Sequence, residues 1–155
     1  MALQTINRVV LGIPGLDENF GGGIPKGSMI VLAGEPGTGK TTFAAQFLYR
    51  GAIDYGEKGM YVSFVEDKST FFNNMRSLGF DFEKLEKEGK FHFLEMLTVR
   101  EAGVPEALNL ILREMTDFGA QRMALDSFTA IAQAVRESQD IRVLLHTFLS
   151  RIIKF

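Results

Sequence analysis

Residues Gly34 to Thr41 read Gly-Glu-Pro-Gly-Thr-Gly-Lys-Thr, which matches the pattern G-x-x-x-x-G-K-[ST]. Glycines at these positions let successive backbone N–H groups turn inward around a phosphate, because no Cβ atom obstructs the turn. An ordinary glycine-rich turn is the alternative, but the apolar segment before the loop and the helical pattern after it favour a phosphate site. The candidate nucleotide-binding residues are Gly34, Glu35, Pro36, Gly37, Thr38, Gly39, Lys40, Thr41 and Thr42.

Two side chains at the end of this loop have predicted roles with a purine nucleoside triphosphate, for which ATP with Mg2+ is the leading candidate. We expect the Lys40 ammonium to reach the β- and γ-phosphates and the Thr41 hydroxyl to bind Mg2+.

Asp126 ends an apolar run and precedes Ser127. This placement is typical of the second acid of such sites, where a carboxylate holds a magnesium-bound water. An aspartate that caps a helix after a buried strand is the alternative interpretation of Asp126.

Glu66 is the candidate catalytic base, and Lys40 is the second candidate catalytic residue. Glu66 follows the apolar run Met60 to Val65. A carboxylate at the end of a strand could accept a proton from a water that attacks the γ-phosphate. The neighbouring acid, Asp67, could instead cap the helix that follows.

These residues need a scaffold, and the apolar pattern predicts an α/β fold. Short apolar runs alternate with longer helical stripes, which is the pattern of a mostly parallel sheet flanked by helices. Strands are predicted at 29–33, 60–65, 91–94 and 121–126, with 29–33 as a buried central strand ahead of the loop. Helices are predicted from the loop to Gly51, from about Ser69 to Gly79, from Val104 to Gly119 and over 141–152, and the mixed-charge segment 83–90 is expected to be solvated.

Composition limits the classes of protein to consider. The 155 residues suit one domain, and a hydrophobic content of 46% can form a real core. Seventeen basic residues against nineteen acidic ones give a net charge of -2, which does not favour nucleic-acid binding. The sequence contains no cysteine and no apolar stretch long enough to span a bilayer, so we expect a cytoplasmic protein without disulfides or a membrane association.

Further motifs stand in a fixed order along nearly the whole chain. The segments are 12–17 (GIPGLD), 20–28 (FGGGIPKGS), the loop, 46–49 (QFLY), 61–64 (YVSF) with Glu66, and 125–127 (LDS). Together they resemble the KaiC-like branch of the RecA-like ATPases. The glycine- and proline-rich opening segments are expected to form tight turns that lead into the first core strand.

The resemblance implies a P-loop NTPase with a RecA-like core that binds ATP and Mg2+, hydrolyses ATP slowly, and forms rings such as hexamers with nucleotide at the subunit interfaces. The family commonly has two consecutive glutamates where this sequence has Val65-Glu66. If the first glutamate is the usual base, either Glu66 takes over its role or catalysis fails. The family's core also continues with a strand that lies between the loop strand and the strand of the second acid. We therefore expect residues 1–155 to form a single ATPase domain that lacks its C-terminal strands and leaves an open slot in the sheet.

The leading hypothesis is an ATP-binding and ATP-hydrolysing KaiC-like ATPase with a regulatory or signalling role, acting as a homo-oligomer with an unidentified protein partner. One alternative is a DNA-dependent ATPase of the RecA or RadA type on the same core. The other is a nucleotide-sensing interaction module without turnover, which the Val65 substitution and the missing strands make plausible.

Overall fold

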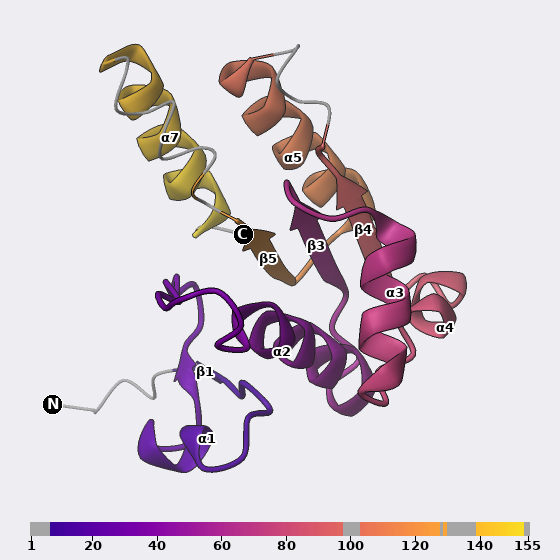
Figure 1. Ribbon diagram of the computed structural model, residues 1–155. Coiled ribbons are helices and arrows are strands. Elements are labelled where there is room, and N and C mark those ends of the chain that lie inside the picture. The colour runs from indigo at the N-terminus through magenta and orange to yellow at the C-terminus, as the bar shows by residue number, and fades with distance from the viewer. Residues whose placement is uncertain (1–6, 98–102, 128, 130–138, 154–155) are drawn as a thin grey trace, which may run out of the picture.

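The computed structural model describes residues 7–97, 103–127, 129 and 139–153. Its elements follow one another along the chain as shown in Figure 1. In order they are β1 (Arg8–Val9), α1 (Leu16–Asn19), β2 (Ile24–Pro25), α2 (Lys40–Asp54), β3 (Gly59–Ser63), α3 (Lys68–Ser77), α4 (Phe82–Lys87), β4 (Phe91–Glu95), α5 (Val104–Phe118), β5 (Arg122–Asp126) and α7 (Gln139–Ile152).

The central sheet is parallel and has the strand order β4-β3-β5 among the described residues. β3 lies in the middle, and its last residue, Ser63, pairs in register with Glu95 of β4 and Asp126 of β5. Because parallel strands end at the same edge of a sheet, this register gathers the residues that follow β3 and β5 at one place. The predicted α/β class with a parallel sheet is confirmed.

Helices cover both faces of this sheet (Figure 1). On one face α2, α3 and α4 pack against the odd-numbered side chains of β3 and β4, which include Tyr61, Phe91 and Phe93. On the other face α5 and α7 pack against Met60 and Val62. The alternation along β3 directs Tyr61 to one core and Met60 and Val62 to the other, and all five residues of the strand are buried.

The prediction of a buried central strand at 29–33 is wrong. The described chain forms no strand there, and its apolar side chains are exposed, with Val31 at 77% and Met29 at 53%. A parallel strand requires backbone partners on a neighbouring strand. Within the described residues β5 pairs only with β3, so the 29–33 segment has no neighbour with which to form a ladder.

Two boundaries and one further helix also differ from the prediction. The first helix does not stop at Gly51 but continues as α2 to Asp54. The 83–90 segment contains a helix, α4, which begins where the Asp81 side chain accepts a hydrogen bond from the Lys84 N–H. The second strand ends at Ser63 rather than Val65, because the Ser63 hydroxyl turns the chain at that point. In contrast, Gly119 ends α5 in the left-handed conformation as predicted.

The opening 12–17 segment forms the predicted tight turn, although it does not lead into a strand at 29–33. The Asp17 carboxylate accepts hydrogen bonds from the backbone N–H groups of Leu11 (2.6 Å), Gly12 (2.9 Å) and Ile13 (3.2 Å). The Gln46 side chain of α2 then donates to the Gly12 carbonyl at 2.8 Å. The turn is thereby attached to the helix that follows the glycine-rich loop.

Candidate functional site

The glycine-rich loop has the conformation that its sequence predicts. Gly37 and Gly39 adopt φ angles of 81° and 86°, which side chains with a Cβ rarely adopt. Gly39 is the N-cap residue of α2, so the loop leads directly into a helix N-terminus. The Thr38 hydroxyl closes the loop by donating to the Glu35 carbonyl at 2.8 Å. The loop thus combines backbone N–H groups with the positive end of a 15-residue helix.

The Lys40 ammonium lies across this loop. Its Nζ donates hydrogen bonds to the carbonyl oxygens of Gly34 (2.7 Å) and Glu35 (2.8 Å). A phosphate oxygen carries more negative charge than a carbonyl, so a bound phosphate would compete well for this ammonium. The role of Lys40 with the phosphates stays a prediction.

Thr41 and Asp126 meet although 85 residues separate them in the sequence. The Thr41 hydroxyl donates to Asp126 Oδ2 at 2.6 Å. α2 positions the threonine in its first turn, and β5 positions the aspartate at its last residue. Of the two interpretations of Asp126, this contact supports a role beside the threonine.

These donors fit Mg2+. A hydroxyl and one carboxylate are hard oxygen donors, and Mg2+ in nucleotide sites binds few protein groups together with phosphates and waters. Among the described residues no group of three or more His, Cys, Asp or Glu side chains could hold a metal ion by itself. The site therefore suits an ion that arrives with a nucleotide.

Tyr61 is a third member of this cluster, and sequence reasoning missed it. Its hydroxyl donates to the same oxygen, Asp126 Oδ2, at 2.7 Å, while its ring is completely buried. Burial, followed by the hydrogen bond to Asp126, raises the pKa of Tyr61 far above its usual value, so it is a neutral donor. The alternating pattern of β3 showed only that Tyr61 would be in the core.

Glu66 lies on a turn that Ser63 fixes. The buried Ser63 hydroxyl accepts from the Glu66 N–H at 3.0 Å and donates to the Glu66 carbonyl at 2.7 Å. Burial raises the pKa of the Glu66 carboxyl, and the charge of Asp126 raises it further. A base with a raised pKa accepts a proton more readily, which favours general-base chemistry.

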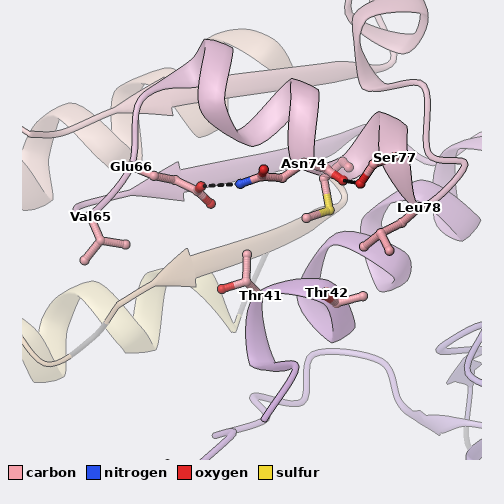
Figure 2. Close-up of a pocket in the computed structure, with 8 residues that line it drawn as sticks. Thr41, Thr42, Val65, Glu66, Asn74, Ser77 and Leu78 are labelled. Atoms are coloured by element: carbon pink, nitrogen blue, oxygen red, sulfur yellow. Dashed lines mark hydrogen bonds between the residues drawn. The ribbon is translucent and has the colours of Figure 1, made fainter. Parts of the chain in front are cut away.

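Thr41 and Glu66 line the same open pocket, which has a volume of about 490 Å³ and is drawn in Figure 2. The Thr41 and Thr42 side chains lie on the α2 side of the pocket, and Glu66 and Asn74 lie opposite them. The Asn74 amide contacts Glu66 Oε2 at 3.5 Å, the outer limit of a hydrogen bond. Val65, at the position where the resemblance implies a glutamate, is 60% exposed at the pocket wall.

Asp67 has the other role considered for it. Its carboxylate accepts from the Ser69 hydroxyl at 2.5 Å and from the Thr70 N–H at 2.9 Å, so it caps α3. The Ser69 hydrogen bond, then those from Thr70, lower the pKa of Asp67. A carboxylate with a lowered pKa is a poor base, so of these two adjacent acids Glu66 is the better proton acceptor.

A glycine-rich loop before a helix, a lysine and a threonine at its end, and a strand-end aspartate on a parallel sheet define the P-loop NTPase class with a RecA-like core. A family model described as "ATPase: KaiC" matches residues 9–155. The chain belongs to this KaiC-like family of ATPases, and ATP binding is the activity that the family shares.

Similar proteins agree with this assignment. The chain is 39% identical over 140 residues to the UPF0273 protein MJ1359 of Methanocaldococcus jannaschii. This match covers 81% of the chain and 58% of that protein. It is 32% identical over 159 residues to the circadian clock oscillator protein KaiC of Synechococcus elongatus, covering 96% of this chain and 30% of that protein. The crystal structure of the KaiC-like protein PH0186 from Pyrococcus horikoshii has a TM-score of 0.82 and 40% identity, and the match covers 97% of this chain and 67% of that one. The chain spans little more than half the length of the UPF0273 relatives.

Proposed function

We propose that the chain binds ATP together with Mg2+ and hydrolyses it slowly, as part of a regulatory or signalling ATPase. The observation that supports this best is the contact between Thr41 and Asp126 beside the glycine-rich loop. Two oxygen donors from distant parts of the sequence converge where a nucleotide's phosphates would lie on the loop.

Each residue has a separate task in this proposal. The loop N–H groups and Lys40 hold the phosphates, Thr41 binds the metal directly, and Asp126 holds a water bound to it. Mg2+ would neutralise charge on the phosphate oxygens when bound. Glu66 accepts a proton from the attacking water, and the Asn74 amide contacts its carboxylate at 3.5 Å.

A nucleotide sensor without turnover is the second candidate function. Val65 stands where the resemblance implies the usual base, and Glu66 is held by only one long side-chain contact among the described residues. Such a base could be too mobile to orient a water, and a 1 Å displacement can cost about 100-fold in rate. The strong phosphate-binding features would then serve binding alone.

The single-domain organisation, the ring-forming homo-oligomer, the protein partner and the cytoplasmic location stay predictions. No described helix has the length and apolar character needed to cross a membrane.

Phosphate release and ATP binding, measured on the same variants, test the proposal. Lys40→Ala should abolish both, because the ammonium is the main positive side chain of the loop. Glu66→Gln should retain ATP binding but release phosphate at least about 100-fold more slowly, as expected for loss of a general base. Glu88→Gln, on an exposed glutamate beside α4, is the matched control and should behave as wild type. If wild type binds ATP but releases phosphate no faster than either variant, the chain is a sensor and the enzymatic part of the proposal is wrong.

A further inference from the structure

The buried hydroxyl of Tyr61 donates a hydrogen bond to the Asp126 carboxylate. The distance from the hydroxyl to Asp126 Oδ2 is 2.7 Å, and the tyrosine is 0% exposed. Phenylalanine would fill the same space without needing a partner, so packing alone does not require the hydroxyl. The hydroxyl is directed at a residue that the proposed function places in the magnesium site.

The ring of Tyr61 cannot move easily. It packs against Phe71 with ring centroids 4.4 Å apart and stacks on Phe93 at 5.6 Å, nearly parallel with an interplanar angle of 7°. β3 holds its backbone in the middle of the sheet. The hydroxyl is therefore a fixed point beside the strand that carries Asp126.

Two hydroxyls donate to the same carboxylate oxygen. Thr41 reaches Asp126 Oδ2 at 2.6 Å from the loop helix, and Tyr61 reaches it at 2.7 Å from the adjacent strand. Two donors from different directions fix the rotation of the carboxylate about its last side-chain bond. Oδ1, which accepts no recorded hydrogen bond from the described residues, is then the oxygen that can hold a magnesium-bound water.

We propose that Tyr61 is a positioning residue of the magnesium site, which orients the Asp126 carboxylate so that Oδ1 faces the metal-bound water. This inference rests on the proposed function. A threonine that binds Mg2+ through its oxygen can keep donating its proton to Asp126, so both hydrogen bonds persist when the metal binds. The Tyr61 hydroxyl also interacts with the Thr41 hydroxyl, the other side chain of the proposed metal site. Among the described residues no hydrogen bond joins Tyr61 to Lys40, so loss of its hydroxyl should act on the metal site and leave the Lys40 ammonium in place.

Tyr61→Phe tests the inference because it removes only the hydroxyl. Binding of a fluorescent ATP analogue is measured across a range of Mg2+ concentrations and separately in EDTA. The Mg2+ concentration that gives the half-maximal effect should rise about 10-fold, as is usual when a residue that orients a metal ligand is lost. Binding in EDTA should stay unchanged, because the loop and Lys40 remain intact.

Tyr49→Phe is the matched control, since it removes a hydroxyl from the same aromatic cluster, where Tyr49 packs against Phe80 and Phe82. It should leave the Mg2+ dependence unchanged. If Tyr61→Phe has the Mg2+ dependence of wild type, or weakens binding equally with and without Mg2+, Tyr61 does not position the site. If wild type itself shows no Mg2+ dependence, both the proposed magnesium site and the role of Tyr61 are wrong. The wild-type result therefore distinguishes failure of the proposed function from failure of the Tyr61 inference alone.

Discussion

Gly51 lies inside α2, and its replacement by alanine should destabilise the protein, contrary to ordinary helix propensity. A Cβ placed on Gly51 would lie closer than 3.0 Å to three atoms of the Arg122 side chain. The arginine side chain is only 2% exposed. Its Nε donates to Glu57 at 2.5 Å, and its Nη1 donates to the Phe47 carbonyl at 3.0 Å. The guanidinium can make room only by giving up one of these partners.

The magnitude follows from three effects. Alanine in place of glycine inside a helix usually stabilises by about 1 kcal/mol. Overpacking a buried site costs about 1–3 kcal/mol, and losing one hydrogen bond of a charged group costs about 1.5–3 kcal/mol. Because Glu57 is partly exposed, we count only one lost hydrogen bond. The expected net loss for Gly51→Ala is about 3 kcal/mol.

Urea unfolding measures this change as a shift in the urea concentration at the transition midpoint, provided that the m-value stays constant. Arg122→Ala supplies the second background, because it removes the atoms that the new Cβ would meet. In that background Gly51→Ala should be neutral or stabilising by up to about 1 kcal/mol. A stabilising effect of Gly51→Ala in wild type, or the same loss in both backgrounds, would refute the steric argument. The result bears on the site, since Gly51 and Arg122 join α2 and β5, whose other ends carry Thr41 and Asp126.

Two further predictions follow from single carboxylates. The raised pKa of Glu66 should place the acid limb of phosphate release above the usual glutamate range: the base must lose its proton to act, so the rate rises as pH rises through that pKa. The measurement is the profile of kcat against pH. If its acid limb lies at the pH of an ordinary glutamate, the pKa of Glu66 is not raised by burial as argued. Asp17→Ala should lower stability by about 2–3 kcal/mol in urea unfolding, because three backbone N–H groups lose a charged acceptor. Glu18→Ala beside it is the control, and equal losses for the two variants would count against this role of Asp17.

Local signals were enough to predict the loop and the helix that follows it. Gly37 and Gly39 need left-handed backbone, and a helix that starts at Lys40 follows from the motif itself. The 29–33 segment shows where such signals fail. Its apolar residues indicate burial, but a strand forms only when another strand supplies hydrogen-bond partners, and those come from distant sequence.

The misinterpretation of Gly51 has a similar cause. Glycine often ends a helix, and the sequence offers no sign that Arg122 passes over this one. Tyr61 and Ser63 were missed because the strand pattern assigns both to the core without showing which buried hydroxyl has a polar partner. Only the pairing of Ser63 with Asp126 across β3 and β5 brings these hydroxyls to the end of β5, where Asp126 lies.

The site holds its binding groups more firmly than its candidate base. Asp126 receives two hydrogen bonds of 2.6 and 2.7 Å from buried or half-buried hydroxyls. The Glu66 carboxylate has one contact of 3.5 Å with an exposed asparagine, although Ser63 fixes its backbone. Short hydrogen bonds to a charged group restrict a side chain far more than one long contact. Turnover should therefore depend on whatever further group orders Glu66 in the pocket, whereas nucleotide binding depends on residues that the fold already holds in place.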